Sequence, residues 1–265
     1  MKKYLVFTMS FILLFVCRGA FGDEANEIIK KSQGIFYYAG NDYKAKVVMK
    51  LIGKEGKERV REMTMLRKNY GEIGGAQKFF IYFTEPADVK NMTFMVYKYA
   101  DKDADRWLFV PALNMVKRIA AQDKTSSFVG SDFTYEDVSG RNIKDDKHEL
   151  LKEESIDGKQ CYMVKSTPIE KTSSYSYKLS WIDKKTLLPV KEEYHDLQGE
   201  TARVFSADKI EDINGFPTIT GRTMKNIQTG HRTEVTFLDT KYNVGIDDNL
   251  FSERYLSQPP AKWVK

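Results

Sequence analysis

The chain has 265 residues, and its 42 basic and 37 acidic residues give a net charge of +5. The first 22 residues hold three of the basic residues and no acidic one, so the remaining 243 residues carry a charge of only +2. This near balance argues against a nucleic-acid-binding protein, which would gather its basic residues on one face. A length of 243 residues suits one all-β domain or two smaller domains, and it is ample for a sizeable core.

The beginning of the chain has the order of a secretory signal peptide. Lys2 and Lys3 precede an apolar run over residues 4–16, and small residues follow before Asp23. That order is typical of a signal peptide, and the run is shorter than the roughly 20 apolar residues that a membrane helix needs. We therefore expect residues 1–22 to be removed near Gly22 and Asp23, leaving an exported, soluble protein.

The two cysteines and three histidines bear on anchoring and on metal binding. Cys17 raises the alternative of an acylated lipoprotein, but Val16 is a poor residue to precede an acylation site, so we favour ordinary cleavage. Cys161 would then stand alone, without an internal disulfide. The histidines show no ligand spacing, and no zinc or phosphate-loop motif is present, so we expect no metal and no cofactor.

Helical signals lie at the two ends of the predicted domain, which spans residues 23–256. Asp23 is placed to cap a helix that runs to Ser32 and stops at Gly34. A second short helix is predicted over residues 247–255, where apolar residues fall at helical spacing. The tail over residues 257–265, which contains two prolines, is predicted to be loosely attached.

Most of the chain between these helices has the pattern of β-strands. Apolar and polar residues alternate with a period of two over residues 43–51, 174–181 and 232–237. Turn residues recur between the strands, for example Asp157-Gly158 and Asn214-Gly215. The pattern predicts an antiparallel sandwich or barrel, with short strands joined by hairpin turns.

One group of strands is apolar on both faces. Residues 79–83, 92–97 and 107–110 do not alternate, and residues 115–119 follow as the returning strand of a hairpin. Because an antiparallel strand with one solvated face alternates, these strands need cover on both sides. We expect one segment to pack on the concave face of the sheet and another on the convex face.

The stretch SSFVGSDFTYED, residues 126–137, follows this hairpin and combines aromatic and acidic residues. Its acids could do acid–base chemistry, but no partner nucleophile is visible. We favour a structural role in which Asp132 caps a short helical turn after Gly130. For Phe128, Phe133 and Tyr135 two interpretations stay open, that they belong to the core or that they line an apolar cavity.

This stretch and the preceding DRWLFVPALNMVKRIA resemble the signature of the outer membrane lipoprotein-sorting protein family, part of the LolA/LolB-like superfamily. The resemblance covers most of the mature chain, including a closing segment DDNLFSERYL. It implies a LolA-like fold, mainly β: an incomplete antiparallel barrel, or strongly curved sheet, whose concave face is closed by short helices. The matching motif positions are Trp107, Pro111, Arg118, Phe128, Gly130, Ser131, Asp132, Phe133, Tyr135, Glu136 and Asp137.

The resemblance implies a periplasmic carrier of lipid or of lipoprotein acyl chains, without enzymatic activity, that takes part in lipoprotein sorting or lipid transport. A sensor or accessory subunit of an ABC or RND-type transporter is the alternative, and a hydrolase ranks a distant third. An apolar hollow with room for a hydrocarbon chain is required. We predict that its walls are formed by Phe79, Ile81, Phe83, Phe94, Val96, Trp107, Phe109, Phe128, Phe133, Tyr135, Tyr177, Leu179 and Trp181.

Overall fold

The computed structural model describes residues 20–170 and 173–264. Most of the predicted signal peptide, including Cys17, therefore lies outside the described residues. The strands are β1 (Asp42–Ile52), β2 (Glu58–Tyr70), β3 (Ala76–Glu85), β4 (Thr93–Lys98), β5 (Asp105–Val110), β6 (Met115–Ile119), β7 (Asp146–Ile156), β8 (Lys159–Pro168), β9 (Tyr177–Asp183), β10 (Pro189–His195), β11 (Thr201–Ile213), β12 (Phe216–Asn226) and β13 (Arg232–Tyr242).

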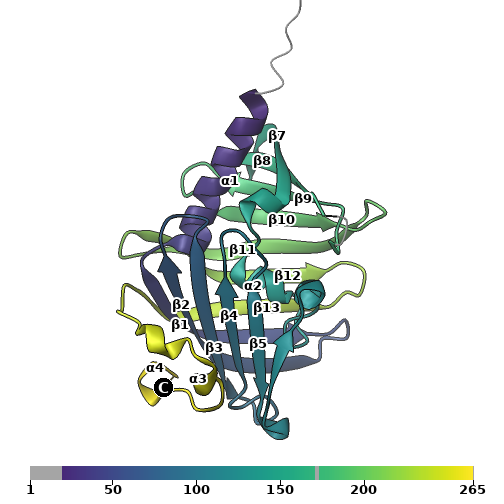
Figure 1. The fold of residues 1–265 in the computed structure, drawn as a ribbon. Coiled ribbons are helices and arrows are strands. Elements are labelled where there is room, and N and C mark those ends of the chain that lie inside the picture. Colours follow the sequence, from purple (N-terminus) through teal and green to yellow (C-terminus); the bar gives the residue numbers. More distant parts are fainter. Residues whose placement is uncertain (1–19, 171–172, 265) are drawn as a thin grey trace, which may run out of the picture.

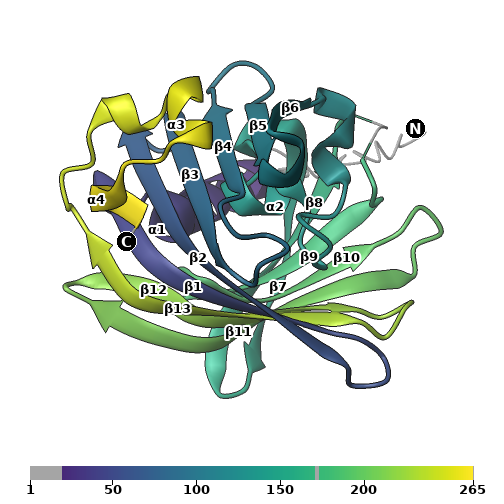
Figure 2. The same cartoon turned by 90° about the horizontal axis from the view of Figure 1, so that it is seen from below.

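Within the described residues these strands form one antiparallel sheet of 13 strands. Consecutive strands pair as hairpins from β1 to β6 and from β7 to β13, and β1 pairs with β13 to join the two runs. The end strands β6 and β7 do not pair with each other, so the sheet stays open. The prediction of a curved, unclosed antiparallel barrel is confirmed, and Figure 2 shows the sheet bending around α1 and α2.

Eight helical elements accompany the sheet, counted over the described part of the chain, and all but the first are short: α1 (Ala20–Tyr38), η1 (Pro111–Leu113), η2 (Ala121–Thr125), α2 (Tyr135–Ser139), η3 (Ile143–Asp145), η4 (Asp248–Leu250), α3 (Glu253–Ser257) and α4 (Ala261–Val264). α1 lies along the hollow of the sheet, and α2 lies in front of its centre (Figure 1). No helix in residues 20–170 or 173–264 is long and apolar enough to cross a membrane.

The first helix runs four residues beyond the predicted stop at Gly34. A Cβ atom at Gly34 would come within 2.6 Å of Cδ1 of Ile73, so this glycine admits a close neighbour and does not end the helix. Further back, Ala25, Ile28 and Ile29 pack on Val164 and Ile182 of β8 and β9. These contacts fix α1 over one end of the hollow.

The two-sided apolar strands are covered on both faces, as predicted. On the concave face, Phe79, Phe83 and Phe94 pack with the aromatic residues of the 126–139 segment. On the convex face, residues 244–264 cover β2 to β5, a position that Figure 1 shows for α3 and α4 (yellow). The buried residues of this second cluster are Leu66, Phe80, Met95, Phe109, Ile246, Leu250, Phe251, Leu256, Trp263 and Val264.

The prediction of a loose tail over residues 257–265 is wrong for its described part. Trp263 is only 6 % exposed and Val264 only 5 %, and the carbonyl of Val264 accepts a hydrogen bond from Thr64 Oγ1 over 3.4 Å. The tail is held because the convex face of β2 to β5 is apolar and needs cover. The predicted helix over residues 247–255 is present as two shorter pieces, η4 and α3.

Candidate ligand-binding site

Residues 126–139, here called the motif segment, form a closed turn and a short helix inside the hollow. The backbone N–H of Phe128 donates to the carbonyl of Phe133 over 2.7 Å, and that of Ser131 donates to the carbonyl of Phe128 over 3.0 Å. Gly130 takes a φ of +76° at the tip, which glycine adopts without steric strain. The turn brings Phe128 and Phe133 together, and both are buried against the sheet.

Eight of the predicted wall residues meet in this concave cluster. The ring centre of Phe128 lies 5.3 Å from that of Phe94 and 5.8 Å from that of Tyr135, and both pairs have an edge-to-face arrangement. Such aromatic pairs add to the stabilisation that burial alone gives. The eight residues are Phe79, Ile81, Phe83, Phe94, Val96, Phe128, Phe133 and Tyr135.

Trp107 and Phe109 do not line the hollow. Phe109 belongs to the convex cluster, and Trp107 packs against it. Because side chains alternate along a strand, it is Leu108 of β5 that faces the concave cluster. The apolar run was predicted correctly, but its register relative to the two faces was not.

Tyr177, Leu179 and Trp181 of β9 also lie on the outer face. Trp181 packs with Cys161, Met163 and Val190, and Leu179 lies against that cluster, while the ring of Tyr177 stacks on His195 at 4.3 Å. The opposite set, Lys178, Ser180 and Ile182, faces the space under α1. The alternation correctly separated the two faces of β9, but the face that carries Lys178 and Ser180 points into the hollow and the apolar face points outward.

The motif acids hold the segment in place. Thr134, and not Asp132 as predicted, is the N-cap of α2: Asp137 N donates to Thr134 Oγ1 over 3.1 Å, and Thr134 N donates to Asp137 Oδ2 over 2.8 Å. Asp132 Oδ2 instead accepts from Thr233 Oγ1 over 2.8 Å and lies 2.6 Å from His231 Nδ1. The favoured interpretation, a structural role for these acids, therefore applies with a different cap residue.

Arg118 stands apart from the other motif residues. It lies on the edge strand β6, its side chain is exposed, and it pairs with Asp105 of β5. Pro111 starts the 3-10 turn η1 between these two strands. Both residues shape the hairpin and do not contribute to the hollow.

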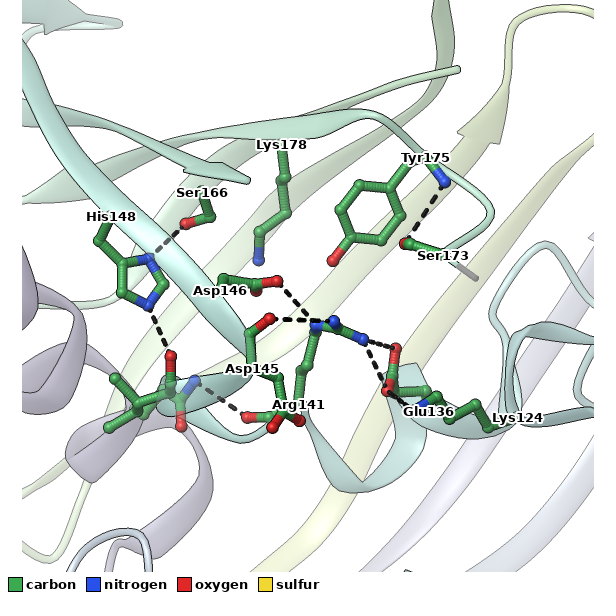
Figure 3. A network of polar contacts seen from close by, with 12 residues as sticks. Lys124, Glu136, Arg141, Asp145, Asp146, His148, Ser166, Ser173, Tyr175 and Lys178 are labelled. Atoms are coloured by element: carbon green, nitrogen blue, oxygen red, sulfur yellow. Dashed lines mark hydrogen bonds and ion pairs between the residues drawn. The ribbon is translucent and has the colours of Figure 1, made fainter. Parts of the chain in front are cut away.

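A cavity of about 70 Å³ lies between α1, α2 and strands β7 to β11, and we call it the polar cavity. Figure 3 shows its charged side chains converging from both sides, with Arg141 at the centre. Arg141 Nη1 lies 3.1 Å from Glu136 Oε1, and Arg141 Nε lies 2.9 Å from Asp146 Oδ1. Lys178 Nζ lies 2.7 Å from Glu192 Oε1. Each of these cations therefore has a carboxylate partner.

Burial shifts the titration of groups in and beside the polar cavity. It lowers the pKa of His148, whose ring nitrogens contact Ser166 Oγ at 2.8 Å and the Ile143 carbonyl at 3.0 Å. Burial also raises the pKa of Tyr175 and Tyr194 well above the usual value for tyrosine. Burial alone would raise the pKa of Asp137, but the charge of Arg203 and the hydrogen bonds from Thr134 lower it. The cavity is thus a buried site in which each cation has a carboxylate partner.

The polar cavity was not predicted from the sequence. Its charged residues come from separate strands and loops. In the strand that holds Lys178, the alternate residues Tyr177, Leu179 and Trp181 were predicted to face the hollow. The signal that could have revealed it is the alternation in β9, if the polar residues of that strand had been assigned to the hollow in place of the apolar ones. Phe36 and Tyr37 of α1 line both this cavity and the next one along the hollow.

Two smaller cavities continue toward β1 to β3. The first, about 50 Å³, lies under α1 and contains two arginine side chains, so we call it the arginine cavity. The second, about 30 Å³, lies between the motif segment and the sheet, and we call it the apolar cavity. The residues that line both are Met65, Val138, Arg222 and Phe237.

The expected room for a hydrocarbon chain is not present in this arrangement of side chains. Phe128 and Phe133 line the apolar cavity and are themselves buried in the concave cluster, so the protein's own rings occupy the hollow. A volume of about 30 Å³ is only two to three times the ~10–15 Å³ that a single water needs, which is far too little for a hydrocarbon chain. Of the two interpretations that the sequence left open for these rings, membership of the core is the one that fits this arrangement of side chains.

An unclosed antiparallel half-barrel, with a helix and a short inserted segment in its hollow, is a LolA-like fold. A family model described as "Uncharacterized protein" matches residues 75–258. A DUF1329 family protein from Desulfovibrio piger is 27 % identical, with a TM-score of 0.83 over 89 % of this chain and 99 % of that one. A protein domain from Vibrio parahaemolyticus described as outer membrane lipoprotein-sorting has the same identity and TM-score, over 89 % and 100 %.

A LolA superfamily protein from Nitrosomonas europaea shares the fold, with 20 % identity and a TM-score of 0.68 over 87 % of this chain and 98 % of that one. No curated protein matches the chain. The family model spans more than half of the sequence. The chain belongs to the family that this model describes, and it shares its fold with the LolA superfamily protein.

Proposed function

We propose that this protein is a periplasmic carrier that shelters the acyl chains of lipids or lipoproteins in the hollow of its sheet. The proposal is supported by its similarity to a lipoprotein-sorting domain and by its LolA-like fold. The predicted signal peptide agrees with a periplasmic location. A transporter partner stays a prediction from the sequence.

One observation carries the proposal: the apolar concave face is covered by inserted elements and not by a second sheet. Phe79, Phe83 and Phe94 are each at most 1 % exposed, yet what lies over them is the motif segment. If that segment moved away, a continuous aromatic and aliphatic surface would be open to an acyl chain. Each CH₂ group transferred from water to such a surface gains about 0.8 kcal/mol.

Besides its buried rings, the cover is held by polar contacts that can separate without unpairing a strand. Asp132 is held by Thr233 and His231, and Arg203 Nη1 donates to the Asp132 carbonyl over 3.0 Å. From α1, Gln33 Nε2 donates to the Arg141 carbonyl over 3.1 Å. Loading would exchange the buried rings of the motif segment for cargo, so that the hollow stays filled in both states.

We also propose that binding takes place without chemical catalysis. The motif acids that could act as acid or base are engaged in structural contacts: Glu136 with Arg141, Asp137 with Arg203 and Asp132 with His231. A general acid or base needs a free proton position near its substrate. These pairings favour a binding protein.

The first experiment is native mass spectrometry on protein purified from the periplasm, together with uptake of a fluorescent fatty acid. Asp132 N lies 3.0 Å from Thr233 Oγ1, so the double variant Asp132→Cys/Thr233→Cys can lock the motif segment to β13 by a disulfide. We expect the reduced variant to take up the fatty acid and the oxidised variant to take up little. Equal uptake in both forms, or no uptake and no bound lipid in the wild type, would contradict the proposal.

A further inference from the structure

Arg222 of β12 places a guanidinium group among aromatic rings inside the hollow. Its Cζ lies 4.9 Å from the ring centre of Phe237, 5.1 Å from that of Phe133 and 5.9 Å from that of Phe36. Among the described residues it has no ion pair, and its buried Nε has no hydrogen-bond partner. The side chain lines both the arginine cavity and the apolar cavity.

A second guanidinium group lies in the same cavity. Arg67 of β2 is 5 % exposed, and one of its Nη atoms donates to the carbonyl of Ala39 just after α1. Its Nε has no hydrogen-bond partner among the described residues, and its Cζ lies 5.2 Å from the ring centre of Tyr43. The described lining of the arginine cavity contains two cations, three tyrosines and no carboxylate.

The neighbouring polar cavity shows what a balanced arrangement looks like in this protein. There Arg141, Lys178 and Arg203 each have a carboxylate within 3.1 Å. Asp137, whose charge acts on Arg222, is already paired with Arg203. Asp42, whose charge acts on Arg67, accepts backbone N–H bonds from residues 244–246. Both of these acids are therefore engaged elsewhere, and neither lines the arginine cavity.

A buried cation without a partner is unfavourable, because it has lost its hydration and gained no counter-charge. Arginine is also the side chain best suited to hold a carboxylate or a phosphate, through two parallel N–H donors. The adjoining apolar cavity shares Arg222 with this site and opens onto the aromatic face. The positions match an anionic head beside the arginines and a hydrocarbon tail along the sheet.

We infer that the arginine cavity is a subsite for an anionic head group, and that the cargo is an acyl-chain amphiphile ending in a carboxylate or a phosphate monoester. This inference rests on the proposed carrier function and narrows its substrate class. The cavity of about 50 Å³ exceeds the ~10–15 Å³ that a single water needs, so it has space for a small polar group. The tail requires displacement of the motif segment.

The test compares cis-parinaric acid, a fluorescent fatty acid, with its methyl ester, which has the same tail and no charge. We expect wild-type protein to bind the acid about ten-fold more tightly than the ester, as a charge-assisted hydrogen bond would give. Arg222→Gln should bring the acid down to the affinity of the ester and leave the ester unchanged. Arg222→Lys should keep part of the preference, and the exposed Arg59→Gln should keep all of it.

The thermal midpoint of Arg222→Gln separates a ligand-binding role from a structural one. Because the guanidinium has no carboxylate partner among the described residues, its removal should leave the midpoint unchanged or raise it. A lowered midpoint with loss of both acid and ester binding would overturn the inference. Competition by lysophosphatidic acid, compared with oleate, shows which anion is preferred, and weaker competition by both than by oleyl alcohol would also overturn it.

The inference and the carrier function can fail separately. If wild-type protein binds acid and ester equally, or if Arg222→Gln keeps the preference for the acid, the head-group subsite is wrong and the carrier function stands. If neither compound binds and no lipid is found in protein from the periplasm, the carrier function fails and the inference fails with it.

Discussion

Arg203 of β11 lies with Nη1 2.8 Å from Oδ2 of Asp137, inside the hollow of the sheet. The same carboxylate oxygen accepts the N–H of Thr134 and completes the cap of α2. This ion pair therefore links the sheet to the helix that covers it. Both side chains are well shielded from water, at 13 % and 16 % exposed.

We predict that Arg203→Met destabilises the protein by about 3 kcal/mol, because it leaves the buried carboxylate of Asp137 unpaired. Chemical denaturation measures the change. The matched control is Lys46→Met, which removes a pair with Asp239 whose partners are 64 % and 68 % exposed and should change stability by no more than about 0.5 kcal/mol. A similar loss of stability in both variants would show that burial of the ion pair makes no difference.

The ion pair between Asp137 and Arg203 also makes the stability of the folded protein depend on pH. Interaction with Arg203 and Thr134 lowers the pKa of Asp137 below its usual 3.8, despite burial. A carboxyl with a lowered pKa stabilises the folded state above its unfolded pKa, and the contribution is lost as pH falls through the folded pKa. We expect the difference in thermal midpoint between wild type and Asp137→Asn to shrink below about pH 4. A difference that stays constant down to pH 2 would rule out this linkage.

Lys98 should give a dependence of the same sign, but at high pH. Burial lowers the pKa of this β4 lysine from 10.5 to about 8, although Glu136 and Asp145 act to raise it. Its amino group donates to the carbonyl of Ser139 over 3.2 Å. Between pH 8 and 10.5 the folded state binds fewer protons than the unfolded state, so stability rises with pH in this window.

The measurement is the free energy of unfolding of wild type and of Lys98→Met at several pH values. Below pH 8, where the lysine is charged in both states, we expect Lys98→Met to be at its most favourable relative to wild type. The wild type should then gain up to about 3 kcal/mol relative to Lys98→Met by pH 10.5. Parallel curves for the two proteins would contradict the lowered pKa.

The packed tail predicts a stability effect at the end of the chain. Trp263→Ala removes a large ring from the convex cluster and should destabilise the protein by about 3–5 kcal/mol. Leu197→Ala is the control, because that side chain is 68 % exposed and its loss should change stability by less than about 0.5 kcal/mol. If both variants unfold at the denaturant concentration of the wild type, the tail contributes nothing to the core.

The prediction from the sequence is correct where local pattern determines the outcome. Alternation over residues 43–51 predicted β1, and the two-sided apolar run at 79–83 predicted covers on both faces. It failed where a three-dimensional relationship decides. Alternation in β9 separates Tyr177 from Lys178 but does not reveal which one faces α1.

The arginine cavity could not be predicted from the sequence for the same reason. Arg67 and Arg222 are 155 positions apart in the chain, and neither stands in a motif. They meet because β2 and β12 both curve around the hollow and α1 closes it. The absence of a carboxylate beside them is a property of the assembled lining alone.

Phe128 provides the most direct link between stability and cargo. Its ring lies 6.1 Å from that of Phe83 and 5.3 Å from that of Phe94, and it lines the apolar cavity. Phe128→Ala should destabilise the protein by about 3–5 kcal/mol, because it leaves a void where the ring was packed. If the ring occupies the position of cargo, the same void should bind a small apolar compound.

We therefore expect benzene or xenon to raise the thermal midpoint of Phe128→Ala and to leave that of the wild type unchanged. Phe109→Ala is the matched control, since its void would open in the convex cluster. Fatty-acid uptake distinguishes the two variants: Phe128→Ala should take up the fluorescent fatty acid faster than wild type, because less of the hollow must be vacated, and Phe109→Ala should not. Faster uptake by Phe109→Ala alone would place the cargo on the convex side of the sheet, under α3 and α4.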